Sequence, residues 1–414
     1  MTASISSTHP VDSPTSPTKP PASARLSSLD QFRGYTVAGM LLVNFLSGFA
    51  VTPAVLGHHN TYCSYADTIM PQFFFAVGFA FRLTFGRRAA TAGLGAAYRH
   101  VARRLFLLAL VAIVFYSYLD WGGLWAGLNS KPYLETLHEA AKRTWFQTLM
   151  HIAVTSLWIL PVIRASALTR IGYLIFSACA HVIVSYDFNL TWINTPPGAI
   201  DGGPLGFLTW CIPTLVGTLA CDAVVGAGAS GPRVMKLALW SVAIMLIGYA
   251  LSCGTRLYDV ARMGITSPGA VNMVLPPLDR SAKGGATSYL AELPFVAPPG
   301  KEARLENYWM MSQRYSSVSY QTFAAGFSLA VYLLFHLLCD FWGLGLGLFR
   351  TLGRNALTGY IIGILIQRQI KSRIPHSNEN QAPAWEVALG FLLLLLCVYA
   401  ILRVLEWRRI FVKL

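Results

Sequence analysis

Charged residues are scarce in this sequence. Asp, Glu, Lys and Arg make up only 12% of its 414 residues, whereas a soluble domain carries about 25%. Hydrophobic residues account for 54%. This composition excludes an ordinary soluble domain and predicts a surface that faces lipid. The 11 Trp, 18 Tyr and 23 Phe suit the aromatic belts found where membrane proteins meet the interface.

Acidic residues are especially few: 18 Asp and Glu stand against 32 Lys and Arg, giving a net charge of +14. In a soluble protein this balance would indicate nucleic acid. Here the basic residues cluster between apolar segments, so we interpret them as charges that fix membrane topology and expect no nucleic-acid partner. The same basic rim would also suit a phosphate-bearing ligand on the cytosolic side.

Several motifs are missing as well. The seven cysteines form no Cys-x-x-Cys pair, and the nine histidines form no His-x-x-x-His or His-Glu-x-x-His pair, so we expect no bound metal. Neither a Walker A nor a Rossmann fingerprint occurs, which disfavours an ordinary nucleotide enzyme. Residues 1–24 are rich in Ser, Thr and Pro and lack an apolar core. They predict a disordered cytoplasmic tail rather than a signal peptide.

Long apolar runs dominate what remains, residues 25–414. A membrane-spanning helix needs about 20 mostly apolar residues, and the pattern predicts an all-α, polytopic membrane bundle with about ten transmembrane helices. The predicted spans lie near 33–52, 67–86, 104–120, 146–163, 171–187, 204–225, 234–253, 319–339, 355–367 and 385–402. The ninth is short, and we expect it to begin in the Gly-rich stretch Gly343 to Gly347 as a broken or re-entrant helix.

Lys and Arg placement predicts the orientation. With the N-terminus inside, 19 of the 32 basic residues fall on cytoplasmic segments, as the positive-inside rule requires. Both termini are then cytoplasmic, and the segment near 254–318 becomes a long extracytoplasmic loop. Loops of this length serve as lids or binding surfaces, and Trp309, in its aromatic stretch, is a candidate substrate contact. We expect a multi-pass integral membrane protein of a bacterial inner membrane.

Two neighbouring histidines are the first candidates for chemistry. His58 and His59 lie in a predicted outer loop just before the second span, which opens near Asp67. An imidazole accepts a proton from an amine or hydroxyl near neutral pH, or takes an acyl group itself. A nearby carboxylate would orient it. The alternative for Asp67 is a helix cap, and a loop histidine by itself is more often only solvated.

Polar residues also mark the first span. Asn44 lies near its middle, where a buried amide needs partners and either joins helices or positions a carbonyl group. Asp30 and Arg33 stand three residues apart at its inner end, on one helical face. They predict either a local ion pair or contacts to a cytosolic ligand.

Two Gly-containing clusters open later spans. Asp201-Gly202-Gly203 precedes the sixth from the outer side, where glycines let the backbone approach a ligand and Asp201 would bind a hydroxyl or amine. Arg354-Asn355 opens the ninth from the inner side, where an Arg and free N–H groups suit a phosphate or pyrophosphate. Plain turns and a positive-inside anchor are the structural alternatives.

Taken together, these motifs resemble the heparan-α-glucosaminide N-acetyltransferase family. The likeness lies in Asp30-x-x-Arg33-Gly34, in Val43-Asn44, in a loop histidine followed by Asp67 before Pro71, and in the later stretch from Gly353 to Leu357. The closing Arg408-Arg409-Ile-Phe411-Val-Lys413 resembles it too, and Asp201-Gly202-Gly203 is a weaker match. The likeness covers most of the chain.

The resemblance implies an acetyltransferase that works across the membrane. Acetyl-CoA would enter the bundle from the cytosol, and the acetyl group would pass to the amine of a terminal glucosamine, or another amino sugar or glycan, on the far side. Carried over by position, Asn44 matches the family's functional Asn, and His58 or His59 its histidine. Acetyl-CoA is thus the expected co-substrate, with Asp30, Arg33, Arg354 and Asn355 as its contacts.

The loop around the histidines departs from the family pattern. The family follows its His with a small residue, a Trp and a Gly before the Asp, whereas here the run from His58 to Ser64 replaces them. The choice between His58 and His59 therefore stays open at this stage, as does the acceptor. Cys63, within the same run, is either a structural residue or an acyl-accepting thiol.

Two other classes remain in competition with an enzyme. Polar residues in mid-span and a broken ninth helix are also typical of a transporter or flippase of a glycan, lipid or small solute. A structural protein that docks partners through its long loop is the third reading, disfavoured because intramembrane polar groups are costly without a task. A homodimer is a further expectation, beside lipid contacts.

Overall fold

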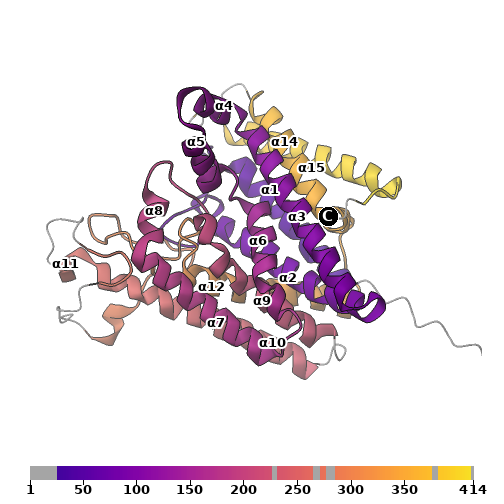
Figure 1. The fold of residues 1–414 in the computed structure, drawn as a ribbon, viewed down its shortest axis with the longest axis horizontal. Coiled ribbons are helices and arrows are strands. Elements are labelled where there is room, and N and C mark those ends of the chain that lie inside the picture. The colour runs from indigo at the N-terminus through magenta and orange to yellow at the C-terminus, as the bar shows by residue number, and fades with distance from the viewer. Residues whose placement is uncertain (1–25, 226–230, 264–270, 277–284, 375–380, 412–414) are drawn as a thin grey trace, which may run out of the picture.

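The computed structural model is a bundle of helices (Figure 1). It describes residues 26–225, 231–263, 271–276, 285–374 and 381–411; the predicted tail at residues 1–24 lies outside them. No β-strand occurs in these ranges, where one isolated bridge joins Asp259 to Arg304. The prediction of an all-α membrane bundle is therefore confirmed.

Fifteen α-helices lie in the described part of the chain. Those of the first half are α1 (Ser27–Leu46), α2 (Tyr65–Ala92), α3 (Leu94–Leu119), α4 (Trp121–Ser130), α5 (Tyr133–Glu139), α6 (Thr148–Ile159), α7 (Ala167–Val184) and α8 (Leu190–Asn194). The second half has α9 (Phe207–Val225), α10 (Gly231–Ser252), α11 (Val260–Met263), α12 (Val318–Phe335), α13 (Gly347–Arg354), α14 (Ala356–Lys371) and α15 (Ala384–Trp407). The remaining one-turn elements are 3₁₀ or π-helical, and the π-helical turns extend α5, α7 and α12.

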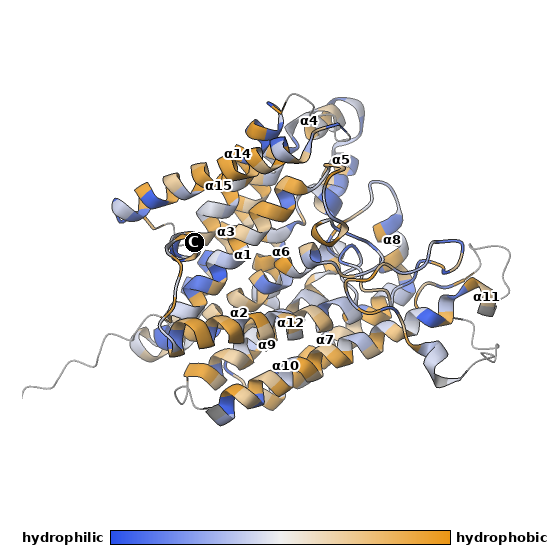
Figure 2. Cartoon of the chain, turned by 180° about the vertical axis from the view of Figure 1, so that it is seen from behind, coloured by the Kyte–Doolittle hydropathy of each residue, from blue (hydrophilic) through white to orange (hydrophobic). Residues whose placement is uncertain are grey.

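Seven helical segments of the described chain are long and apolar enough to cross a membrane, and a bent pair would make eight. Figure 2 shows how strongly α7, α10 and α15 are coloured as hydrophobic. The seven segments correspond to seven of the ten predicted spans. They are Tyr65–Ala92, Leu94–Leu119, Ala167–Asn194, Gly203–Val225, Pro232–Tyr258, Val318–Phe341 and Ala384–Trp407.

The other three predicted spans also fold as helices, but they differ from simple spans. The segment 33–52 becomes α1, which begins at Ser27 among polar residues and ends at Leu46. The segment 355–367 becomes α14, which has only 16 residues and is shorter than a span needs. The segment 146–163 becomes α6, which joins the helical run Tyr133–Thr144 at an 85° bend. By length and composition, seven or eight segments of the described chain qualify as spans, and the exact count of about ten stays a prediction.

The expected break in the ninth segment is present. α13 begins at Gly347, ends at Arg354, and is separated from α14 by Asn355 alone. The backbone of Asn355 leaves the helical region, with φ −123° and ψ 42°. This confirms that the helix starts earlier than its apolar run and is interrupted.

Glycines allow two pairs of helices to cross with their backbones in contact. A methyl group at Gly78 of α2 would lie 1.9 Å from the carbonyl oxygen of Thr214 in α9, and one at Gly217 would lie 2.1 Å from that of Phe75. The crossing of α1 and α13 is just as close. There, a methyl group at Gly34 would lie 1.8 Å from the carbonyl oxygen of Phe349.

We expect Gly78→Ala to destabilise the bundle. Because the added methyl group meets backbone rather than a movable side chain, α2 and α9 must separate, at a cost of about 1–3 kcal/mol or more. Thermal unfolding in detergent measures the effect. Gly172→Ala is the control, because nothing lies within 4 Å of the added methyl group and alanine favours helix. Equal unfolding temperatures for both variants would contradict the close crossing.

The long loop between α10 and α12 is held by a buried ion-pair network. The Arg304 side chain is fully buried and donates to Asp259 at 2.6 Å and to Glu292 at 2.5 Å. Further along, the N–H of Phe295 donates to the carbonyl oxygen of Cys63 at 3.0 Å. The loop therefore packs directly on the segment that carries the two histidines. Its predicted place outside the membrane remains a prediction.

Candidate functional site

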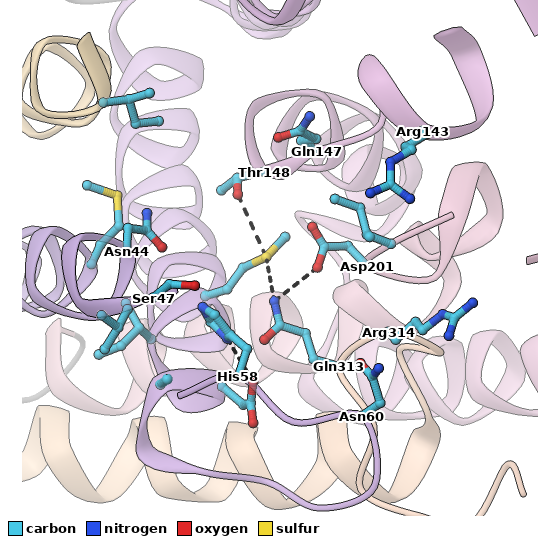
Figure 3. A pocket seen from close by; sticks show the side chains of 18 of the residues that line it. Asn44, Ser47, His58, Asn60, Arg143, Gln147, Thr148, Asp201, Gln313 and Arg314 are labelled. Carbon is cyan, nitrogen blue, oxygen red and sulfur yellow. Dashed lines mark hydrogen bonds and ion pairs between the residues drawn. The ribbon is translucent and has the colours of Figure 1, made fainter. Parts of the chain in front are cut away.

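A cavity of about 980 Å³ lies where the ends of several helices meet (Figure 3). The last turns of α1 and α14 form one wall, and the start of α2 with residues 58–60 forms another. The N-terminus of α6, the turn 194–201 and residues 313–314 complete it. Segments from the whole length of the chain therefore build one site.

His58 and Asp67 form the central pair of this cavity. The Nδ1 atom of His58 lies 2.9 Å from Oδ1 of Asp67. The Asp67 side chain is 1% exposed, whereas 39% of the His58 side chain remains accessible at the cavity wall. Because an ionised carboxylate only accepts hydrogen bonds, the Nδ1 atom of His58 must carry a proton to bond with it. In the neutral imidazole, Nε2 is then the nitrogen that can accept a proton.

Asp67 is fixed in place by the start of α2. The Ser64 backbone N–H donates to Oδ2 of Asp67 at 2.9 Å, and the Asp67 N–H donates to the Ser64 hydroxyl at 3.3 Å, which makes a capping box. Tyr320 of α12 donates to the Asp67 carbonyl oxygen at 2.6 Å. The predicted cap and the predicted orientation of an imidazole therefore coexist, one carboxylate oxygen serving each.

The pKa of His58 is raised above its ordinary value. Burial lowers the pKa of this imidazole, but the hydrogen bond and negative charge of Asp67 outweigh that effect. Asp201 and Gln313 add smaller contributions in the same direction. The cationic form of His58 therefore persists to higher pH than that of a free histidine.

His59 has a different environment although it also lines the cavity. Its Nε2 atom lies 2.7 Å from the carbonyl oxygen of Ala54, and its ring stacks on Tyr62 at 4.3 Å between centroids. Among the described residues, no hydrogen bond joins its ring to a carboxylate. The structure thus separates the two histidines, and only His58 is paired with Asp67.

Asn44 lies on the α1 wall of the cavity, as Figure 3 shows. Its backbone carbonyl oxygen accepts a hydrogen bond from Gln367 of α14 at 2.9 Å. Its side-chain amide makes no hydrogen bond within the described residues and so remains available to a ligand. The predicted contact between helices is therefore made by the backbone of Asn44, which bonds with the Gln367 side chain, and not by the Asn44 amide.

Asp201 faces the cavity from the opposite side, at the turn before α9. Gln313 donates to its Oδ1 atom at 3.0 Å. Burial raises the pKa of Asp201 to about 6, and the charge of Asp67 also raises it, while Gln313 and His58 act in the opposite direction. Asp201 and His58 therefore lie on two walls of one cavity, and the pKa of each is raised above its ordinary value.

The other predicted substrate contacts lie outside the cavity lining. Gly202 and Gly203 have positive φ angles of 83° and 59°, and a side chain at Gly202 would meet Ser316 at 2.6 Å. Their glycine requirement is explained by the turn and its packing. Trp309 donates from its indole to the Val274 carbonyl oxygen at 2.8 Å and packs within the long loop.

The residues predicted to contact acetyl-CoA gather elsewhere. Asp30 and Arg33 begin α1 where it crosses α13, next to Arg354 and Asn355. None of the four lines the cavity, and Asn44 lies about 21 Å from Asp30 along α1 at 1.5 Å per residue. The four residues lie near one another, at the opposite end of α1 from the cavity, and their contact with acetyl-CoA stays a prediction.

Two of these four residues have specific environments. Arg354 forms an ion pair with Glu406 of α15, which also pairs with Arg403. Asn355 is 2% exposed, yet neither its amide nitrogen nor its amide oxygen has a hydrogen-bond partner among the described residues. An orphaned buried amide is costly, so Asn355 is a polar position that a ligand would satisfy.

Cys63 is fully buried beside the histidine loop. Burial raises the pKa of its thiol well above the ordinary value, and the charge of Asp67 adds to this. Because the thiolate is the nucleophilic form, the environment favours the structural alternative for Cys63.

Several cavity residues escaped the sequence analysis. Gln313 and Arg314 end the long loop, and Gln147 and Thr148 begin α6. The hydroxyl groups of Tyr116 and Tyr360, which also line the cavity, lie 2.8 Å apart. The only sequence signal for Gln147-Thr148 and Gln313-Arg314 is that each is a polar pair shortly before an apolar run. Most helix starts show the same pattern, so it does not identify a functional residue.

Within the described residues, no group of three or more His, Cys, Asp and Glu side chains lies close enough to hold a metal ion. No protein-family model matches this chain, and no curated protein matches it.

Proposed function

We propose that the protein is a transmembrane acetyltransferase with His58 as its base or acyl carrier. The observation that carries the proposal is the His58–Asp67 pair, joined at 2.9 Å on the wall of a cavity of about 980 Å³. A buried carboxylate behind an accessible imidazole is the arrangement that proton-transferring triads use. The resemblance to the heparan-α-glucosaminide N-acetyltransferase family supplies the choice of acetyl-CoA as donor.

The proposal gives a role to three cavity residues, His58, Asn44 and Asp201. As the acceptor amine or hydroxyl forms its bond to the acetyl carbon, Nε2 of His58 takes its proton, and the carbon–sulfur bond of the thioester breaks. The His58 proton then passes to the departing CoA sulfur. Asn44 donates to the carbonyl oxygen as negative charge develops there, and Asp201 binds a hydroxyl or amine of the acceptor.

A two-step route uses the same residues. In it, Nε2 of His58 first takes the acetyl group and releases CoA, and the acceptor then attacks the acetyl-imidazole. A transfer across the membrane suits this order, since donor and acceptor need not be bound together. The acceptor we propose is a terminal amino sugar or glycan.

Acetyl-CoA would be held between two regions. Asp30, Arg33, Arg354 and Asn355 are the proposed contacts for its phosphate-bearing end, supported by the orphaned amide of Asn355. Arg354 and Arg403 together outnumber Glu406 by one charge, which favours an anion at this end. When bound, acetyl-CoA supplies an activated thioester to the cavity.

The test is turnover of acetyl-CoA by the purified protein. We expect release of free CoA thiol to depend on added glucosamine, with N-acetylglucosamine formed in equal amount, as measured by a thiol reagent and mass spectrometry. A protein with both histidines replaced is the control. Absence of CoA release with a panel of amino sugars would overturn the proposal.

A transporter or flippase is the second candidate, favoured by the break between α13 and α14 at Asn355, since interrupted helices are typical of transport sites. Uptake of radiolabelled glucosamine into proteoliposomes without CoA release would favour this function.

A further inference from the structure

A second hollow of about 760 Å³ lies at the far end of α2 from the His58 cavity. We call it the arginine groove; it is lined by parts of α2, α3 and α9 and by the turn after α6. Arg82 and Arg87 lie 15 and 20 residues beyond Asp67 on α2, which is about 22 and 30 Å along the helix. The two hollows are therefore separated by the length of a membrane span.

Positive charge exceeds negative charge in the arginine groove. Arg82, Arg87 and Arg164 line it with a single carboxylate, Asp222. That carboxylate is already shared, because Arg82 contacts both of its oxygens at 2.7 and 3.1 Å and the buried Arg170 pairs with it from behind. One carboxylate does not balance the three lining arginines, so the groove has a net positive charge.

Two of the lining cations have no counter-ion among the residues that the structure describes. No ion pair or side-chain hydrogen bond engages the guanidinium groups of Arg87 and Arg164 within the described part of the chain, and both residues are exposed. They come from different elements, α2 and the turn after α6, and face the same hollow. Guanidinium groups from separate elements form a two-sided clamp for a planar or tetrahedral oxyanion.

The remaining lining is apolar, which narrows the ligand class. Leu94 at the start of α3 and Val225 at the end of α9 both line the groove, and each is more than 40% exposed. These residues terminate candidate spans, so the groove adjoins the level at which lipid headgroups lie. We propose that the arginine groove binds the phosphate group of an anionic phospholipid, with Arg87 and Arg164 as the contacts.

The proposal predicts that binding depends on the groove rather than on basic charge in general. Arg99 and Arg103 of α3 are also exposed and basic, but they do not line the hollow. The double variant R99Q/R103Q therefore changes the net charge by the same amount as R87Q/R164Q. Neither pair belongs to the His58 cavity.

Native mass spectrometry of the full chain in neutral detergent tests the proposal with two lipids, dioleoylphosphatidylglycerol and dioleoylphosphatidylcholine. We expect a preference for phosphatidylglycerol, weakened about thirtyfold in R87Q/R164Q and retained in R99Q/R103Q. Size-exclusion elution and thermal unfolding confirm that each variant is folded. An equal loss in both double variants, or no preference between the two lipids, would overturn the groove as the site.

A second experiment, with inorganic phosphate in place of lipid, distinguishes a lipid phosphate from a soluble one. Inorganic phosphate is titrated into the detergent-solubilised protein, and thermal unfolding is followed. We expect no stabilisation by inorganic phosphate at concentrations up to the millimolar range, because the apolar rim contributes only to a lipid. Stabilisation by inorganic phosphate that is lost in R87Q/R164Q, without lipid selectivity, would reject the phospholipid in favour of a soluble phosphate ligand.

Discussion

Replacement of His58 with alanine is expected to lower acetyl transfer by about 10²–10⁴-fold, the usual contribution of a positioned acid–base group. Loss of the imidazole removes the ring that pairs with the Asp67 carboxylate. His58→Ala keeps the capping box, because Ser64 rather than His58 completes it. The rate of CoA release with a saturating amino-sugar acceptor is the measurement.

His59→Ala provides the matched control for that experiment. It removes a neighbouring imidazole of the same loop but leaves the His58–Asp67 contact intact, so we expect a change of only a few-fold. Mass spectrometry of the intact protein after a short exposure to acetyl-CoA adds a second readout. An acetyl group that accumulates on wild type and His59→Ala, but not on His58→Ala, indicates the two-step route. Full activity in His58→Ala would rule out the histidine mechanism.

The apolar spans were predictable from sequence because their signal is local. Seven of the ten predicted segments are long apolar helices in the structure, since hydrocarbon thickness alone sets their length. α1 and α14 were predicted as helices, but their ends differ from the predicted ones. α1 starts six residues before its predicted boundary, at Ser27, because polar residues at a helix start carry no hydropathy signal.

The site was only partly predictable because it is assembled from distant segments. Asn44, His58, Asp67 and Asp201 were each recognised as polar residues in unusual places, and the structure brings all four to one cavity. Gln313 belongs with them through its hydrogen bond to Asp201, a contact across 112 residues. No local pattern encodes such a contact, since it depends on how the long loop folds back.

Choosing between the two histidines also required the structure. Sequence spacing places both within ten residues of Asp67, and either would reach it through a flexible loop. The geometry separates them because the capping box fixes the carboxylate and the Ala54 carbonyl oxygen occupies Nε2 of His59. The glycines of the turn at Gly202 have a structural role in backbone packing, and their contact with a ligand stays a prediction.

The second large effect is expected from Asp67→Asn, which should lower the maximal rate about 10²–10⁴-fold and also change its pH dependence. An asparagine keeps the size of the side chain and an oxygen for the cap, but it loses the charge that stabilises the His58 cation. Burial lowers the pKa of His58, and in this variant the charge of Asp67 no longer counteracts it. The pKa of His58 should therefore fall from above its ordinary value to below it.

The sign of the shift follows from the form of His58 that reacts. The base must be neutral, so the wild-type rate rises with pH as His58 loses its proton at a raised pKa. In Asp67→Asn this rise should move to lower pH, even though the plateau is much lower. Asp201→Asn should move it slightly in the same direction, because the charge of Asp201 raises the pKa of His58 less than that of Asp67. A plot of rate against pH between about 5 and 9, bracketing the unperturbed histidine value, measures both. An unmoved profile with a reduced plateau would mean that Asp67 supports only the fold of the loop, and that the rate does not depend on the protonation of His58.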